Sequence, residues 1–270
     1  MTSPYQSVFR NALFENKIII VTGGGSGIGR CTAHELASLG AKVILVGRKI
    51  EKLDSVVAEI KEDGGSADRY AFDIRDEEVV QCNVEDMVSK YGVIHGLVNN
   101  AGGQFPSPLA KISQKGWETV VRSNLTGGFL MAKEVYLRSM SKHGGSIVNI
   151  VMDMWGGSPA MGHSGAARAG MVNFTQTAAV EWATSGVRVN AVAPGWVASS
   201  GMDSYPDSMT PWLFKLKDAV PCKRLGTESE VSSAICFLLS DGASFVSGDC
   251  LRIDGAASQG GRVVPLPEAK

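Results

Sequence analysis

The sequence lacks the features of several classes of protein. It contains no apolar run close to the roughly 20 residues that a membrane-spanning helix needs. Residues 1–17 contain no apolar segment of the kind that a secretory signal requires, and the final PLPEAK is not a peroxisomal address of the Ser-Lys-Leu type. Lys and Arg total 26 against 27 Asp and Glu, giving a net charge of −1, and no basic cluster indicates a nucleic-acid-binding surface. We therefore expect a cytoplasmic protein that binds neither nucleic acid nor membrane.

Metal-ligating residues are also sparse. The four histidines are scattered along the chain, and the cysteines are odd in number and include no Cys-x-x-Cys pair: Cys31, Cys82, Cys222, Cys236 and Cys250. This spacing is typical of buried, reduced thiols in a cytosolic protein rather than of disulfides or of a metal site. The sequence therefore predicts no bound metal.

Glycine, by contrast, is abundant, at 32 of 270 residues or about 12%, against roughly 7% on average. The glycines separate short Val- and Ile-rich runs from longer segments with helical spacing of apolar residues. The runs predict buried strands at 17–22, 41–46, 67–72, 94–98, 146–151, 187–192 and 251–253. Helices are predicted at 28–39, 50–60, 80–91, 114–141, 164–184 and, from a capping box at Thr227 and Glu230, at 227–239.

This alternation predicts an α/β fold with a single Rossmann-like domain over residues 1–270. Its doubly wound, seven-stranded parallel sheet would carry helices on both faces. Residues 199–221 interrupt the alternation and are predicted to form a substrate-binding lid, because long insertions at the carboxyl edge of such sheets commonly bind ligands. Residues 257–270 are predicted to form a C-terminal tail.

A glycine-rich turn follows the first predicted strand. Residues 22–29 read Thr-Gly-Gly-Gly-Ser-Gly-Ile-Gly, with Gly-x-x-x-Gly-x-Gly spacing. Without Cβ atoms the chain turns sharply, and the next helix can aim its free N–H groups at a pyrophosphate. The turn therefore predicts a dinucleotide site formed by Thr22, Gly23, Gly25, Ser26, Gly27, Ile28 and Gly29.

Two cations follow the second predicted strand, where an NAD-binding fold would place an acidic residue. They are Arg48 and Lys49. The guanidinium of Arg48 suits a 2′-phosphate, and cations at the positive end of a helix dipole are unfavourable unless an anion offsets them. The sequence thus predicts NADP(H) as the cofactor in preference to NAD(H).

With these motifs, the segment Asn99-Asn100-Ala101-Gly102 completes a resemblance to the short-chain dehydrogenase/reductase family over residues 14 to 256. The resemblance implies that Asp73 lies beside the adenine, that Asn100–Gly102 run along the nicotinamide ribose, and that Ser199 contacts the carboxamide. It adds Ile74, Asn100, Ala101, Gly102, Pro194, Gly195 and Val197 to the expected cofactor-binding residues. The family's dimers and tetramers imply a homodimer or homotetramer, for which the small residues of helix 164–184 would allow close helix contact.

The catalytic positions depart from the family's Asn, Ser, Tyr and Lys. The Tyr and Lys positions match Ser164 and Arg168, the Ser position falls on Val151 or Met152, and Asn124 alone stands as expected. A serine hydroxyl is a poor proton acceptor and arginine keeps its proton, so the pair is ill suited to alcohol oxidation. Both groups are donors, however, and can stabilise the enolate oxygen formed when hydride adds to an α,β-unsaturated thioester.

Three segments extend the resemblance to the peroxisomal-type trans-2-enoyl-CoA reductases: Gln104-Phe105, residues 164–170 and Val231-Ser232-Ser233. The Ser-x-x-x-cation pattern is similar to that of 2,4-dienoyl-CoA reductases. Val172 and Gln176 stand where the peroxisomal branch carries Tyr and Lys. The resemblance implies an NADP(H)-dependent enoyl-CoA reductase. Two alternatives remain open, namely an alcohol dehydrogenase or ketoreductase, for example on terpenoid alcohols, and a cofactor-binding protein without turnover.

Several other side chains have more than one interpretation. His163 is predicted to be a polar residue at a helix start rather than an acid, and Asp153 either a buried acid or a loop cap. Trp212 and Phe214 would line an acyl tunnel or pack the lid onto the domain. Of the tyrosines, only Tyr205 on the lid is expected to reach a substrate.

Overall fold

The computed structural model describes residues 12–199 and 210–259, the last without the side chains of 210–214. Its main sheet has seven strands, all parallel, in the order β3-β2-β1-β4-β5-β6-β9. The strands are β1 (Ile18–Thr22), β2 (Lys42–Gly47), β3 (Ser66–Ala71), β4 (Gly96–Asn99), β5 (Gly145–Ile150), β6 (Val187–Pro194) and β9 (Cys250–Ile253). Each lies within two residues of its predicted position, so the predicted doubly wound Rossmann-like fold is confirmed.

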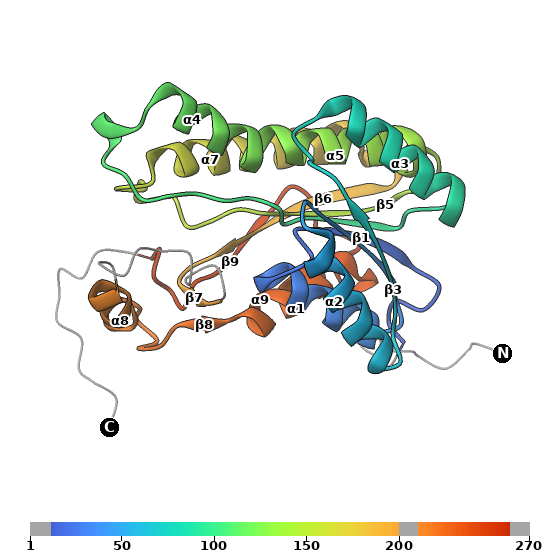
Figure 1. The fold of residues 1–270 in the computed structure, drawn as a ribbon, viewed down its shortest axis with the longest axis horizontal. Coiled ribbons are helices and arrows are strands. Elements are labelled where there is room, and N and C mark those ends of the chain that lie inside the picture. Colours follow the sequence, from blue (N-terminus) through green and yellow to red (C-terminus); the bar gives the residue numbers. More distant parts are fainter. Residues whose placement is uncertain (1–11, 200–209, 260–270) are drawn as a thin grey trace.

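Helices cover both faces of the sheet (Figure 1). One layer contains α1 (Gly27–Ser38), α2 (Ile50–Glu62) and α9 (Glu228–Leu239). The other contains α3 (Glu77–Tyr91), α4 (Gln114–Val121), α5 (Gly127–Val135) and α7 (Gly162–Glu181). The amphipathic pattern explains the packing: α2 buries Leu53, Val56, Val57 and Ile60, spaced as one helical face. Within the described part of the chain, no helix combines the length and the apolarity that crossing a bilayer requires.

The predicted helix 114–141 is interrupted by two wider turns. A π-helical segment, Arg122–Thr126, joins α4 to α5, and a second, Tyr136–Met140, joins α5 to the short α6 (Ser141–His143). Each π turn inserts extra residues per turn, and such insertions recur at functional sites. The first one contains Asn124, so the wider turn sets the direction of a predicted catalytic side chain.

The predicted lid is joined at its base. The short parallel pair of β7 (Val197–Ala198) and β8 (Gly226–Thr227) brings together the two ends of the segment between them. Helix α8 (Thr210–Ala219) forms part of that segment. Residues 200–209, with Tyr205, and the side chains of Trp212 and Phe214 lie outside the description, as do residues 260–270 of the tail. Both the lid and the tail therefore stay predictions.

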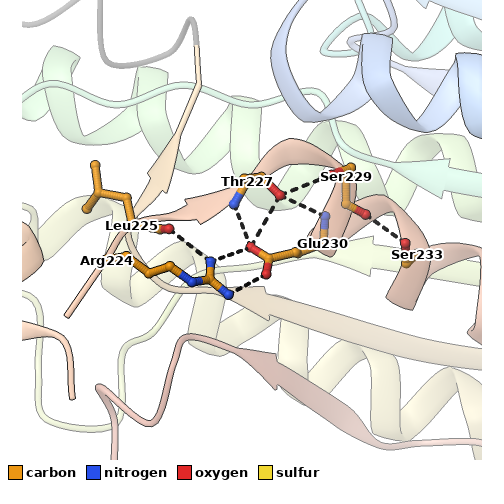
Figure 2. Close-up of polar contacts among 6 residues, drawn as sticks. All are labelled: Arg224, Leu225, Thr227, Ser229, Glu230 and Ser233. Carbon is orange, nitrogen blue, oxygen red and sulfur yellow. Dashed lines mark hydrogen bonds and ion pairs between the residues drawn. The ribbon is translucent and has the colours of Figure 1, made fainter. Parts of the chain in front are cut away.

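The capping box predicted at the start of α9 is confirmed (Figure 2). The Glu230 N–H donates to the Thr227 hydroxyl at 3.3 Å, and the Thr227 N–H donates to a Glu230 carboxylate oxygen at 2.9 Å. Arg224 adds two hydrogen bonds to that carboxylate, at 2.9 and 2.6 Å. The pKa of Glu230 is lowered to about 2, chiefly by the hydrogen bonds from Arg224. The network fixes the chain where the predicted lid returns to the domain.

Candidate functional site

The glycine-rich turn adopts the conformation that its glycines allow. Gly23 and Gly27 have φ of +66° and +58°, which disfavour residues with a Cβ atom. Ser26 is the N-cap of α1, and its side chain makes no capping hydrogen bond. The N–H groups of the first turn of α1 are therefore positioned to bind an anion, as the sequence predicts.

Asn100 and Thr22 fasten this turn to the end of β4. The Thr22 hydroxyl accepts hydrogen bonds from the N–H groups of Asn100 and Ala101, at 3.0 and 2.9 Å, and the Asn100 amide donates to Thr22 O at 2.9 Å. A Cβ atom on Gly29 would lie 2.4 Å from both the Asn100 amide nitrogen and Gly23 O. Gly29 is thus needed for packing inside the protein, and its contact with the cofactor stays a prediction.

A pocket of about 260 Å³ opens beside the turn at the carboxyl edge of the sheet. Nine of the predicted cofactor residues line it: Gly23, Gly25, Ser26, Arg48, Lys49, Asp73, Ile74, Ala101 and Gly102. The lining also includes residues that sequence reasoning missed, among them Gly47, Lys52, Arg75 and Ser123. The other nine predicted residues are not among those that line it: Thr22, Gly27, Ile28, Gly29, Asn100, Pro194, Gly195, Val197 and Ser199.

The end of this pocket near β2 is rich in cations. Arg48, Lys49 and Lys52 are exposed, and none forms an ion pair with a carboxylate in the described residues. Asp73 is occupied by Arg75, whose Nη2 lies 2.5 Å from a carboxylate oxygen. The hydrogen bonds from Arg75 hold the pKa of the Asp73 carboxyl below its usual value. Arg75 stands two residues after Asp73, and this spacing is the sequence signal that could have indicated its place in the pocket.

Asn124, Gly102 and Arg168 converge next to the pocket. The Asn124 amide donates to Gly103 O at 2.6 Å and to Val120 O at 2.8 Å, and its carbonyl accepts from the Gly103 N–H at 3.2 Å. A Cβ atom on Gly102 would lie 2.4 Å from the Asn124 carbonyl oxygen and 2.6 Å from Arg168 Nη2. Glycine at 102 therefore lets the loop after β4 approach both side chains. Asn124 holds that loop in place.

Arg168 is a buried cation. It is 9% exposed, its Nη1 donates to Ile150 O, and its Nε has no hydrogen-bond partner among the described residues. Burial lowers the pKa of Arg168 to about 10, which still leaves the guanidinium protonated at neutral pH. The structure thus places a positive charge where the resemblance aligns the family's lysine.

Ser164 is fully buried in the first turn of α7. Its hydroxyl donates to the Gln104 side-chain oxygen at 2.6 Å, and the sulfur of Met152 lies 3.4 Å away. The N-cap of α7 is Met161, so Ser164 does not cap the helix. The sequence singles out Gln104 only through the resemblance to enoyl-CoA reductases. Its hydrogen bond with Ser164 joins residues 60 positions apart, which sequence spacing could not predict.

His163 lies at the start of α7, as predicted, but its ring is fully buried. Its Nδ1 accepts a hydrogen bond from the Ser164 N–H at 2.8 Å, and the ring packs edge to face with Phe105. Asp153 is half-buried, and its backbone N–H donates to Pro194 O at 3.3 Å. These contacts anchor the loop after β5 to the end of β6.

The described tyrosines of the N-terminal half are engaged away from the pocket, as predicted, whereas Tyr5 lies outside the described residues. Tyr70 donates to Asp86 and Tyr91 to Asp68, while Tyr136 stacks on the Trp182 ring. None of the three lines the pocket. The part of the chain that the structure describes thus offers no tyrosine base beside Ser164 and Arg168.

The five cysteines are free thiols, but only Cys236 is buried, so the prediction of buried thiols is wrong for the exposed Cys82 and Cys222. The described ranges contain no cluster of His, Cys, Asp or Glu that could hold a metal ion. The polar side chains that line the pocket are those of Ser26, Arg48, Lys49, Lys52, Asp73, Arg75 and Ser123.

Comparison with known proteins places this site in a family. Residues 23–258 match a family model described as enoyl-(acyl carrier protein) reductase. The chain is 34% identical over 244 residues to a Bacillus subtilis (strain 168) protein described as a probable 2,4-dienoyl-CoA reductase. The matched residues cover 89% of this chain and 96% of the relative.

Two solved structures are also similar. A citronellol catabolism dehydrogenase (AtuB) of Pseudomonas aeruginosa PAO1 is 63% identical, with a TM-score of 0.85 over 94% of this chain and 100% of that one. A protein described as an NAD(P)-dependent gluconate 5-dehydrogenase of Beutenbergia cavernae, with NADP bound at low occupancy, is 31% identical, with a TM-score of 0.84 over 90% of this chain and 97% of that one. The chain belongs to the short-chain dehydrogenase/reductase family of oxidoreductases.

Proposed function

We propose that the protein is an NADP(H)-dependent reductase of α,β-unsaturated acyl thioesters such as 2-enoyl-CoA. The observation that carries this proposal is the pair of buried donors, Ser164 and Arg168, at the positions where the family's tyrosine and lysine stand. Reduction of a conjugated double bond needs stabilisation of the enolate oxygen and no base, whereas alcohol oxidation needs a base. The matched enoyl reductase model and the dienoyl-CoA reductase relative support the same assignment.

The pocket residues fit a phosphorylated dinucleotide. The turn at 23–27 leaves space that a Cβ atom would fill, and the first turn of α1 presents N–H groups to a pyrophosphate. Arg48, Lys49 and Lys52 supply unpaired positive charge for a 2′-phosphate. When bound, NADPH supplies the hydride for the β-carbon of the substrate.

The remaining roles belong to Ser164, Arg168 and Asn124, which contact the loop of residues 102–104. The Ser164 hydroxyl donates a hydrogen bond to the thioester oxygen, which takes the place of the Gln104 side-chain oxygen. The charge of Arg168 stabilises the enolate, and Asn124 positions the loop that ends the cofactor pocket. The α-carbon then takes a proton from water.

A substrate screen tests this proposal. We expect the purified protein to oxidise NADPH when it is given 2-enoyl-CoA substrates from crotonyl-CoA to dodecenoyl-CoA. It should not reduce NADP⁺ when it is given alcohols. The absorbance of NADPH at a fixed cofactor concentration measures both reactions. Oxidation of alcohols without reduction of any enoyl thioester contradicts the proposal. Cofactor binding without turnover in every assay favours a sensor or partner subunit instead.

A terpenoid alcohol dehydrogenase is the second candidate. It is favoured by the 63% identical structure, which is described as a citronellol catabolism dehydrogenase. Citronellol with NADP⁺ or NAD⁺ belongs in the same screen. Rapid citronellol oxidation would require a base other than Ser164 and Arg168, and Tyr205 is the tyrosine that the sequence places on the predicted lid.

Cofactor choice can be tested at Arg48. Replacing Arg48 with alanine is expected to weaken NADPH binding by about 2 kcal/mol, the value of a charge-assisted hydrogen bond, and to change NADH binding less than twofold. Isothermal titration calorimetry measures both constants. Lys61→Ala, which removes a cation from the far end of α2, is the control. Equal weakening for both cofactors, or a native preference for NADH, contradicts the assignment.

A homodimer or homotetramer is proposed from an exposed apolar surface on α5, the π segment after it and α7. Phe129, Leu137 and Val180 are 41%, 54% and 78% exposed, and contact with another chain would remove them from water. Light scattering at micromolar concentration should give the mass of two or four chains. Phe129→Asp is expected to shift that mass toward one chain, and a wild-type monomer contradicts the proposal.

A further inference from the structure

Arg252 and Trp155 form a stacked pair at the carboxyl edge of the sheet. The guanidinium carbon of Arg252 lies 3.7 Å from the centroid of the Trp155 ring, and Trp155 is 41% exposed. An aromatic face holds an arginine flat and leaves the N–H groups in the plane of the guanidinium free to bind a partner. One of them donates to the Ser258 hydroxyl at 3.2 Å. The pair is thus an oriented cation at the protein surface.

This pair lies beside the predicted nicotinamide end of the cofactor site. A Cβ atom on Gly195 would come within 2.8 Å of Asp254, two residues after Arg252. On the other side, the Asp153 N–H donates to Pro194 O, two residues before Trp155. The two side chains therefore meet over the end of β6, where the chain turns through Pro194 and Gly195.

Strand alternation puts Arg252 on the same face of the sheet as α7. Cys250 packs against the cluster that includes Met171 of α7, whereas Leu251 and Ile253 pack into the core on the opposite face. Arg252 shares the face of Cys250. Strands β5, β6 and β9 are successive neighbours, so β9 lies about 10 Å from β5. Arg252 is thus on the face where Ser164 and Arg168 lie, two strands away.

Arg252 forms no ion pair with a carboxylate in the described ranges, although its charge contributes, after the hydrogen bonds from Ser258 and Ala256, to the lowered pKa of Asp254. The nearest acidic residue in sequence, Asp254, accepts hydrogen bonds from the N–H groups of Ala256 and Ser258, at 2.9 and 3.0 Å, and forms no ion pair with Arg252. Arg252 is half-buried beside the exposed Trp155, and a guanidinium oriented in this way suits a phosphate or a carboxylate.

We propose that Arg252, held by Trp155, binds a phosphate of the acyl carrier of the substrate. This inference rests on the proposed function, because it takes the substrate to be a thioester. In a thioester the carboxyl group carries no charge, so the phosphates of the carrier, coenzyme A or phosphopantetheine, are the anions that a simple 2-enoyl substrate presents. A neutral terpenoid alcohol presents none.

Binding of the carrier alone tests the site without turnover. Calorimetry with NADP⁺-saturated protein would compare coenzyme A, 4′-phosphopantetheine and pantetheine, which carries no phosphate. We expect Arg252→Gln to raise the Kd of coenzyme A about tenfold and to leave pantetheine unchanged, since a charge-assisted hydrogen bond is lost. The Kd of coenzyme A for Arg252→Lys should lie between the values for the wild type and for Arg252→Gln. Arg69→Gln, an exposed arginine on the opposite edge strand β3, is the matched control and should change neither Kd more than twofold.

Kinetics then separate this inference from the proposed function. With Arg252→Gln the KM for crotonyl-CoA should rise about tenfold while kcat and the KM for crotonyl-pantetheine stay within twofold of wild type. If Arg252→Gln weakens the binding of 4′-phosphopantetheine, Arg252 contacts the phosphate of that molecule. If the variant weakens the binding of coenzyme A alone, Arg252 contacts the phosphates of the nucleotide.

Two results overturn the inference: an unchanged Kd for coenzyme A in Arg252→Gln, or equal KM values for crotonyl-CoA and crotonyl-pantetheine in the wild type. The second result leaves the proposed reaction intact. Binding of coenzyme A that depends on Arg252, without reduction of any enoyl thioester, supports the site and contradicts the proposed reaction.

Discussion

Replacing Ser164 with alanine is expected to lower the single-turnover rate of crotonyl-CoA reduction about 100- to 1000-fold. The hydroxyl is proposed to stabilise the enolate oxygen, and one such donor is typically worth about 10² to 10³ in rate. Because this interaction forms mainly in the transition state, kcat and kcat/KM should fall together. Stopped-flow absorbance of NADPH with enzyme in excess over substrate measures the step directly.

A matched serine separates chemistry from packing. Ser232 is also fully buried on a helix, and its hydroxyl donates to Ser229 O within α9, far along the chain from the candidate site. Ser232→Ala should lower the melting temperature to a similar degree and keep the wild-type rate. If Ser164→Ala reacts within threefold of wild type, Ser164 contributes packing alone and the proposed mechanism is wrong.

The sheet and the glycine-rich turn could be predicted because each rests on local chemistry. A run such as Ile18–Thr22 is almost wholly apolar because both faces of a parallel strand are buried, so the strand can be recognised from the sequence itself. Positive φ values at Gly23 and Gly27 follow from a turn that other residues disfavour. The capping box of α9 depends on two residues three positions apart, so it too is readable from spacing.

The details of the site depend on contacts between distant residues, which spacing does not encode. The π turn that orients Asn124 has no breaker residue within it, since 122–126 read Arg-Ser-Asn-Leu-Thr. Gln104 reaches Ser164 across 60 positions, and Arg168 reaches the backbone of β5. Gly29 illustrates the converse, because its spacing suggested cofactor contact while its missing Cβ makes room for Asn100.

Replacing Arg168 with methionine is expected to lower kcat/KM for crotonyl-CoA about 1000-fold. The substitution removes the buried positive charge proposed to stabilise the enolate and leaves Ile150 O without its donor. An unsatisfied buried carbonyl also costs about 1–3 kcal/mol, so the free energy of unfolding should fall. Arg188→Met is the control, because Arg188 is a half-buried arginine that likewise donates to backbone carbonyls, at Leu238 and Ser240. It should lose comparable stability and keep the wild-type rate.

Arg168→Lys separates the charge of residue 168 from its shape by pH dependence. Burial already lowers the pKa of Arg168 to about 10, so the wild-type guanidinium stays charged from pH 6 to 8 and its single-turnover rate should be flat over that range. A lysine has a lower intrinsic pKa, and the same burial disfavours its charged form, so the variant loses its charge at a lower pH than the wild type. Its rate should therefore approach wild type at pH 6 and fall as the pH rises. If the single-turnover rate of Arg168→Lys instead stays at the level of Arg168→Met at every pH from 6 to 8, the site requires the forked hydrogen bonds of arginine and not the charge alone.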